Sequence, residues 1–241
     1  MFATGLQRWM YRYVAKPFFF LRDPEAVHDR ALWIGRLVGA HPVSRSALRL
    51  LEAYEDPRLK QTILGIDFDN PVGLAAGFDK NAQLTNTLPA VGFGFAEVGS
   101  ITGEPCAGNP KPRLWRHPDL RSLRVYFGLK NDGAVAIARR LRDLSFSVPI
   151  GISIAKTNCH ATVEQTAAIA DYVKAYEAFD GIGAYDTINI SCPNAYGGQP
   201  FTDPDRLDTL LQALSERRNK KPMFLKLSPD LSLAQLDAIA T

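Results

Sequence analysis

Reactive and polar side chains gather where short apolar runs of this 241-residue chain end. In TINISCPN, residues 187–194, Cys192 stands between the amides of Asn189 and Asn194. A free cysteine often packs as a small hydrophobe, so the thiol alone is ambiguous between core filler and catalytic group. Pro193 removes a ladder donor and ends the strand, which places Cys192 at the strand's end. That position favours a catalytic role for Cys192.

Other apolar runs end in the same way. Small residues and a lysine follow the first run, serines end or follow the next two, and a lysine interrupts the last: Ala76, Gly77, Lys80, Ser100, Ser153 and Lys226. A lysine buried in MFLKLSP would need a partner, because burying a charge alone is very costly. The set holds no acid pair, no Ser–His–Asp arrangement and no metal-ligand cluster. It suits a planar heteroaromatic cofactor that packs over small residues while amides hold a polar ring.

A repeated βα pattern must position these side chains. Strands are predicted at 72–76, 95–99, 148–154, 187–191 and 223–227, and helices near 81–90, 132–144, 162–178, 204–218 and 232–240. The runs show few polar residues on either face, which is typical of parallel strands covered by helices. Asp203 and Pro204 form a helix start signal. The stretch TILGIDFDNP before the first run predicts a small β-hairpin.

Repeated βα units form either a doubly wound sheet or a (β/α)8 barrel. The doubly wound dinucleotide fold needs GxGxxG after the first strand, and GLAAGFDKN lacks it. We therefore expect an α/β (β/α)8 TIM barrel, whose catalytic residues lie at the carboxyl ends of its strands. A full barrel of about 250 residues plus the N-terminal segment would need roughly 330. With only about five of eight units present, the chain is expected to be C-terminally truncated.

The N-terminal segment, residues 1–60, is predicted to form three helices ahead of the barrel at 61–241. Residues 1–50 carry eight basic and three acidic residues, whereas the whole chain has a net charge of +3, too small to indicate nucleic-acid binding. One face of the first helix presents apolar residues: Leu6, Trp9, Met10, Tyr13 and Val14. This face suits either a membrane surface or packing on the barrel. No run is long enough to span a bilayer, and no signal peptide is expected, because basic residues interrupt the first apolar residues. The three cysteines form no paired framework and indicate a reducing compartment without a metal site.

Several motifs in order resemble those of dihydroorotate dehydrogenases, which are FMN-dependent (β/α)8 barrels. They are NPVGLAAGFDKN, AEVGSITGEP, NPKPRLWR, TINISCPN and FLKLSPD, and FLRDPEAVHDRAL resembles the helical extension of the membrane-associated, quinone-reducing class. The resemblance implies oxidation of (S)-dihydroorotate to orotate with a quinone as acceptor, in de novo pyrimidine (UMP) biosynthesis. It also implies a peripheral place on the cytoplasmic side of the inner membrane, or on the mitochondrial inner membrane in a eukaryote.

The resemblance also implies residue roles. Cys192 takes the position of the catalytic base, and Lys226 would stabilise the negative charge of reduced flavin. The other FMN-contacting positions are Ala76, Gly77, Lys80, Ser100, Ser153 and Asn189. Substrate would contact Lys80, Asn189 and Asn194, and quinone would pass His28 and Arg116. AYGGQPFTDP resembles the mobile active-site loop, with Gly197 and Gly198 as a hinge.

Three departures from the family pattern are visible. The quinone-using class usually has serine as base, whereas cysteine is typical of the soluble classes. Val125 and Leu129 stand where the family has a substrate-binding asparagine and a phenylalanine, and Ser153 replaces a flavin-contacting asparagine. A lost amide in a polar-ring pocket weakens recognition of its substrate. Two alternatives therefore stay open: a flavin barrel acting on another dihydropyrimidine-like ring, and a non-catalytic barrel relative that binds a membrane or a partner.

Overall fold

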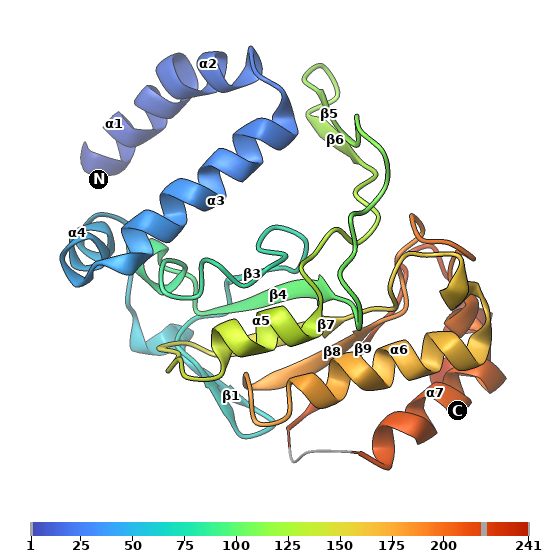
Figure 1. Ribbon diagram of the computed structural model, residues 1–241. Coiled ribbons are helices and arrows are strands. Elements are labelled where there is room, and N and C mark those ends of the chain that lie inside the picture. Colours follow the sequence, from blue (N-terminus) through green and yellow to red (C-terminus); the bar gives the residue numbers. More distant parts are fainter. Residues whose placement is uncertain (1, 218–220, 241) are drawn as a thin grey trace.

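A five-stranded parallel sheet forms the centre of the computed structural model, which describes residues 2–217 and 221–240 (Figure 1). Its strands lie in the order β3 (Gly73–Leu74), β4 (Phe95–Ile101), β7 (Ile150–Ile154), β8 (Tyr185–Asn189) and β9 (Met223–Lys226). Each strand pairs in parallel with the next one along the chain, without the reversal of order that defines a doubly wound sheet. The predicted barrel-type α/β fold is confirmed. Within the described residues the sheet stays open between β3 and β9.

Helices cover one face of this sheet (Figure 1). They are α5 (Ala134–Leu141), α6 (Gln165–Ala178) and α7 (Pro204–Ser215), while α8 (Leu233–Ala240) follows β9 and contacts α7. All four lie close to the predicted positions, although residue 218 of the predicted fourth helix lies outside the described residues. Asp203 caps α7, since its carboxylate accepts the Arg206 N–H at 3.1 Å.

The helix predicted near 81–90 is wrong. This stretch forms turns and ends in a short 3-10 helix, Pro89–Val91. The buried carboxylate of Asp79 accepts the backbone N–H groups of Gln83 at 2.8 Å and Leu84 at 2.7 Å. These bonds offer the backbone a local alternative to helical hydrogen bonding.

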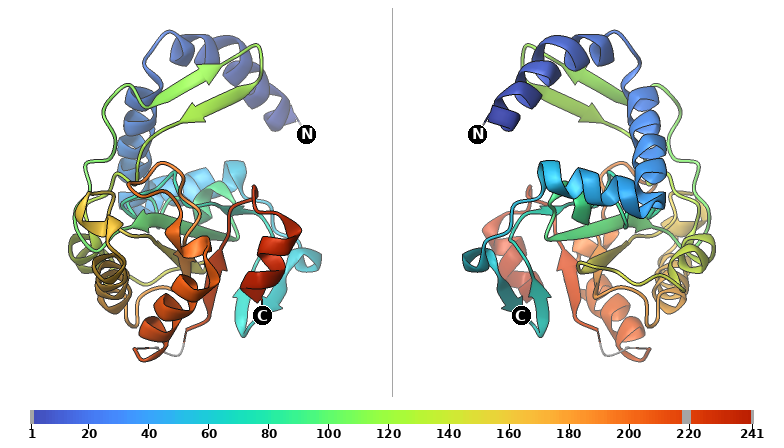
Figure 2. Two further views of the ribbon diagram at one scale, coloured as in Figure 1. Left: turned by 90° about the vertical axis from the view of Figure 1, so that its right-hand side faces the viewer. Right: turned by 90° about the vertical axis from the view of Figure 1, so that its left-hand side faces the viewer.

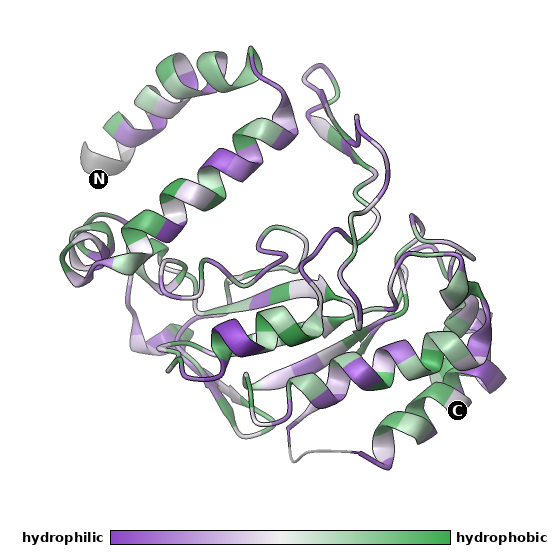
Figure 3. Ribbon diagram, viewed as in Figure 1, coloured by the Kyte–Doolittle hydropathy of each residue, from purple (hydrophilic) through white to green (hydrophobic). Residues whose placement is uncertain are grey.

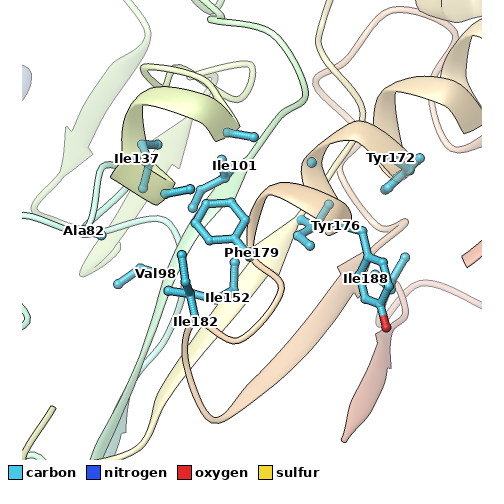
Figure 4. Packing of buried hydrophobic residues seen from close by; sticks show 14 of the residues in the cluster. Ala82, Val98, Ile101, Ile137, Ile152, Tyr172, Tyr176, Phe179, Ile182 and Ile188 are labelled. Carbon is cyan, nitrogen blue, oxygen red and sulfur yellow. The ribbon is translucent and has the colours of Figure 1, made fainter. Parts of the chain in front are cut away.

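The two faces of the sheet differ in polarity. Ile152 lies beside Phe179 at the C-terminus of α6, and Ile188 lies beside Tyr176 of the same helix, with all four residues fully buried (Figure 4). The opposite face carries Thr187, whose Oγ donates to Glu97 Oε2 at 2.9 Å. The prediction of strands apolar on both faces is therefore wrong for this inner face.

Two hairpins flank the sheet. β1 (Gln61–Ile63) and β2 (Ile66–Phe68) form the predicted hairpin. A second hairpin, β5 (Leu114–His117) with β6 (Ser122–Val125), was not predicted and projects away from the sheet (Figure 1). Its strands are short, with β5 mostly half-buried and β6 exposed, so neither shows an alternating pattern.

The N-terminal helices lie over one end of the sheet, on the same side as the β5–β6 hairpin (Figure 2). They are α1 (Phe2–Met10), a π-helical turn (Tyr11–Ala15), α2 (Lys16–Phe20), α3 (Pro24–Ala40) and α4 (Pro42–Glu52), so the first helical run extends further than predicted. Figure 3 shows apolar stretches along α1 and α2, away from the sheet. Trp9 is 53% and Tyr13 58% exposed, so this face does not pack on the barrel. None of the helices in the described part of the chain is both long and apolar enough to cross a membrane.

Candidate active site

Side chains at the carboxyl ends of four strands form one hydrogen-bonded chain, which we call the strand-end network. Ser153 and Ser100 share a hydrogen bond of 2.8 Å between their hydroxyls, and Asn189 Nδ2 donates to Ser100 Oγ at 2.7 Å. Asn189 Oδ1 accepts the N–H and Oγ–H of Ser191 at 3.0 and 2.8 Å. Lys226 Nζ completes the chain by donating to Ser191 Oγ at 2.6 Å. Three predicted site residues are thus bonded directly, and the fourth, Lys226, joins them through Ser191, a residue the sequence analysis had not assigned a role.

The network fixes one polar surface across β4, β7, β8 and β9. Both ends of the Asn189 amide are engaged, so its orientation follows from its partners. Lys226 has a partner, as expected, but its side chain is exposed rather than buried. The reason is that β9 is the last strand of the described sheet, so its inner face is open. One layer below, burial raises the pKa of Glu97, and the charge of Lys226 opposes that rise.

The predicted small residues lie in the turn after β3. Gly77 has φ +106°, a conformation that favours glycine, and its N–H donates to Gly99 O at 2.8 Å. Gly99 directly precedes Ser100 of the strand-end network. A Cβ at Gly77 would meet nothing within 4 Å. The turn around Ala76 and Gly77 therefore offers an open, small-residue surface next to the network.

Lys80 stands apart from the strand-end network. Its ammonium lies 4.0 Å from the ring centroid of Phe127, a cation–π contact. Burial, followed by the charge of Lys130, lowers the pKa of Lys80 to about 8, while Asp29 and Glu25 oppose the shift. A desolvated lysine of this kind is poised to accept an anionic group, whose charge would stabilise the ammonium.

A cavity of about 830 Å³ joins Lys80 and Gly77 to the N-terminal helices. His28 and Arg116, the predicted quinone-tunnel residues, both line it. His28 Nε2 is hydrogen-bonded to Phe78 O at 2.9 Å, and burial, followed by the charge of Lys80, lowers the pKa of His28. The cavity therefore leads from the helices to two of the predicted flavin-contacting residues.

The helical end of this cavity is built from aromatic and basic side chains. Arg116 donates to Arg22 O at 2.8 Å, and its guanidinium lies 4.8 Å from the ring centroid of Phe20. These contacts connect the β5–β6 hairpin to α2 and to the turn that follows it.

A buried ion pair holds α3 against the segment before β5. Arg113 donates to both carboxylate oxygens of Glu25, with Nη2 to Oε1 at 2.8 Å, and the two side chains are 5% and 4% exposed. This hydrogen bonding lowers the pKa of Glu25 to about 2 despite its burial. The sequence analysis missed the pair, although both residues lie in quoted motifs, DPEAVH and NPKPRLWR.

Cys192 lies beside the network, partly buried, in a narrow cavity that Asn189 and Leu129 also line. Burial raises the pKa of its thiol, and the charges of Lys226 and Lys156 oppose that rise. The structure therefore does not depress the pKa of this thiol below its ordinary value.

Asn194 is held by backbone and side-chain partners. Its Nδ2 donates to Val125 O at 3.2 Å, and its own carbonyl accepts from Asn109 Nδ2 at 3.0 Å. Val125 thus reaches Asn194 through its backbone alone, while its side chain is 48% exposed. Asn109 is the first residue of the quoted motif NPKPRLWR, but the sequence analysis assigned it no role.

Comparison with known proteins settles the family. A family model described as dihydroorotate dehydrogenase matches residues 58–241. The chain belongs to the dihydroorotate dehydrogenase family. A dihydroorotate dehydrogenase (quinone) of Synechococcus sp. is 41% identical over 95% of this chain, and that of Gloeobacter violaceus is 40% identical over 95%.

Solved structures agree with this membership. A dihydroorotate dehydrogenase from Eimeria tenella in complex with ferulenol superposes with a TM-score of 0.75 at 29% identity over 90% of this chain. The chain covers 61% and 64% of the two curated relatives and 62% of the Eimeria tenella chain, less than two thirds of each. The family resemblance predicted from the motifs is confirmed.

Proposed function

We propose that this chain carries the active site of a flavin-dependent dihydroorotate dehydrogenase that passes electrons to a quinone. The reaction would oxidise (S)-dihydroorotate to orotate, a step of de novo pyrimidine (UMP) biosynthesis. The observation that carries the proposal is the strand-end network, which lies between the Ala76–Gly77 turn and the Cys192 thiol. Family membership and the names of the quinone-linked relatives support it.

The residues present fit FMN. The open surface at Ala76 and Gly77 would accept a flat ring without a side-chain clash, because a Cβ at Gly77 meets nothing within 4 Å. Ser100, Ser153 and Asn189 supply hydroxyl and amide groups along one edge. Lys226 places a cation at the end of the same row. Bound FMN would supply the hydride acceptor of the reaction.

The chain's own residues would then bind the substrate and move its proton. Lys80 would pair with the substrate carboxylate, and that anion would raise the lowered pKa of the lysine towards its ordinary value. Asn189 and Asn194 would hold the polar ring. The Cys192 thiolate would take the proton from the carbon next to the one that loses the hydride. Because burial raises the thiol's pKa, this step should be faster at alkaline pH.

The 830 Å³ cavity is proposed as the quinone tunnel. His28 and Arg116 would face the quinone there, between the helical segment 1–60 and the sheet. The exposed apolar side chains of α1, together with the basic excess of the segment, support peripheral binding to a membrane. The membrane would be the cell inner membrane on its cytoplasmic side, or the mitochondrial inner membrane in a eukaryote.

One observation favours a second candidate, the oxidation of a different dihydropyrimidine-like ring. Val125 presents no side-chain amide, and its carbonyl is already engaged by Asn194. A pocket without that amide would discriminate less strongly for the orotate ring.

The test is anaerobic bleaching of the flavin in the full-length protein on addition of dihydroorotate. Bleaching by wild type, lost in Cys192→Ala and partly kept in Cys192→Ser, is the expected result. Cys159→Ala is the matched control, because this half-buried thiol contacts Thr162 rather than the network. A yellow protein that is bleached by dihydrouracil but not by dihydroorotate would establish the second candidate. A protein that stays colourless after FMN addition would point to a non-catalytic relative.

A further inference from the structure

Lys156 is a buried lysine that the proposed reaction does not use. It follows β7, and only 3% of its surface is exposed. Its Nζ donates to the backbone carbonyl of Tyr196 at 2.6 Å. Burying an ammonium is costly, so we expect a lysine at this position to have a role that a neutral side chain could not fill.

A second side chain holds the same residue of the loop. Asn158 Oδ1 accepts the backbone N–H of Tyr196 at 2.8 Å, so both polar backbone groups of Tyr196 are bound by the segment after β7. Asn158 is itself fixed, because its Nδ2 donates to Asn109 Oδ1 at 3.0 Å and to Gly128 O at 3.1 Å. We call Lys156 and Asn158 the loop clamp.

The loop held by the clamp begins at the proposed base. Residues 192–198 run from Cys192 to Gly198, and Gly197 and Gly198 both have positive φ. Lys156 and Cys192 line the same narrow cavity. An ammonium close to a thiol in a water-poor site favours the thiolate more strongly than it would in water.

We propose that Lys156 is a positioning residue that couples closure of the 192–198 loop to ionisation of the Cys192 thiol. With the loop closed, the Tyr196 carbonyl holds the ammonium in place beside the cavity that contains the thiol. With the loop open, Lys156 loses this acceptor and water screens its charge. The Lys156 charge would thus offset part of the cost that burial places on the thiolate in the closed state, where water is excluded from the proposed reaction.

The charged and titratable groups around the two residues are consistent with this coupling. For Cys192, burial raises the pKa and Cys106 adds to that rise, whereas the backbone hydrogen bond of Asn194 and then the charges of Lys226 and Lys156 oppose it. For Lys156, burial lowers the pKa, and Cys159, Asp171 and Cys192 oppose this. Asp171 is largely engaged elsewhere, since its carboxylate accepts the N–H and hydroxyl of Thr157, both at 2.7 Å.

Two substitutions separate the charge of Lys156 from its hydrogen bond. Lys156→Met removes both, whereas Lys156→Gln removes the charge and keeps an N–H donor. Lys174→Met is the matched control, because Lys174 lies on the outer helix α6, is exposed, and pairs with Glu104. All are made in the full chain, and circular dichroism verifies that each variant folds.

Two readouts need neither flavin nor substrate. The first is the pH dependence of Cys192 alkylation by iodoacetamide, followed by peptide mass spectrometry. The second is chymotrypsin cleavage after Tyr196, whose side chain is 55% exposed. Lys156→Met should raise the alkylation midpoint by about one pH unit and speed cleavage roughly fivefold. Lys156→Gln should raise the midpoint by a similar amount with cleavage near the wild-type rate, and Lys174→Met should change neither.

An alkylation midpoint unchanged in folded Lys156→Met or Lys156→Gln would overturn the proposal. So would faster cleavage with an unshifted midpoint, because it would show a purely structural clamp. The catalytic consequence rests on the proposed function: the pH profile of flavin reduction should move with the alkylation midpoint. If the alkylation and cleavage results hold while dihydroorotate leaves the flavin oxidised, the coupling stands and the proposed substrate is wrong.

Discussion

The sheet and the N-terminal helices bury very different kinds of side chain. The sheet and its covering helices enclose large apolar groups, among them Phe179 and Leu210, which are fully buried. Among the described side chains of residues 5–52, only Glu25 and Gly39 are buried. The N-terminal helices are therefore held by the buried Glu25–Arg113 ion pair, which we call the charged anchor, whereas the sheet is held by an apolar core.

Close backbone approach supplements this anchor. A Cβ at Gly39 would lie 2.3 Å from Thr87 Oγ1, and one at Gly35 would lie 2.6 Å from Leu84 Cδ2. The Thr87 hydroxyl donates to Gly35 O at 2.7 Å. Glycine lets α3 lie directly on the turn region after β3. The N-terminal helices are thus positioned by a few specific contacts, so they should open at a lower free energy than the sheet.

Removing the charged anchor should have the largest effect. Glu25→Gln leaves Arg113 buried without its carboxylate partner. It should lower the free energy that holds the N-terminal helices on the sheet by about 3 kcal/mol. All three tryptophans, Trp9, Trp33 and Trp115, lie in the helical segment or the β5–β6 hairpin. Urea unfolding followed by tryptophan fluorescence should therefore shift far more than unfolding followed by the near-UV signal of the core tyrosines.

The stabilising contribution of the Glu25–Arg113 pair should depend on pH. The folded-state pKa of Glu25 is lowered to about 2 from 4.5, so its stabilising contribution is complete above pH 4.5 and is lost as pH falls towards 2. The difference between wild type and Glu25→Gln should shrink over that range. Glu55→Gln is the control, because its pair with Arg49 is exposed and should be worth at most about 1 kcal/mol. Coincident fluorescence and near-UV transitions in Glu25→Gln would contradict a separately anchored segment.

The sequence predicted the five strands of the central sheet and the polar residues at their carboxyl ends because both depend on local pattern. Apolar runs that end in polar residues located Ser100, Ser153, Asn189 and Lys226 at the carboxyl edge of the sheet, where the network joins them. The Glu25–Arg113 pair was missed because its partners are 88 residues apart. A lone charge on a helix is usually solvated, so nothing local reveals such a partner.

Other misses have equally specific causes. The stretch at 81–90 was predicted as a helix from its place after the first strand, but the Asp79 carboxylate accepts two of its backbone N–H groups and holds it in turns. The loop clamp escaped notice because Lys156 acts on Tyr196 through a backbone carbonyl, which carries no sequence signal. The exposure of Lys226 depends on what lies beside β9 in the sheet, and the residues of β9 itself do not encode their neighbours.

Lys80 lies where the two regions meet, and its replacement should have an intermediate effect of opposite sign. Because its folded-state pKa is about 8 rather than 10.5, the ammonium destabilises the folded chain at neutral pH. Lys80→Met should stabilise the protein at pH 7 by about 1–2 kcal/mol, after allowance for solvent screening. The gain should fade as pH rises from 8 towards 10.5, where both wild-type states lose the charge.

Urea unfolding at pH 7 and pH 9.5 measures the Lys80 effect, with Lys60→Met as the control at an exposed lysine paired with Asp69. Lys80→Met should also lose flavin bleaching by dihydroorotate, so stability and function would move in opposite directions. A variant less stable than wild type at pH 7 would show that the Phe127 contact outweighs the cost of burial.

The exposed face of α1 and of the π-helical turn that follows it should matter least for stability and most for location. Trp9→Ser combined with Tyr13→Ser should change the free energy of unfolding by no more than about 0.5 kcal/mol, because both side chains are more than half exposed. Co-sedimentation with anionic phospholipid vesicles should fall about tenfold, since two aromatic groups would no longer enter the headgroup region. Leu233→Ser is the control, an equally apolar residue 80% exposed at the start of α8. Equal loss of vesicle binding in this control would mean that the chain binds lipid non-specifically, and unchanged binding in the double variant would remove α1 from the membrane contact altogether.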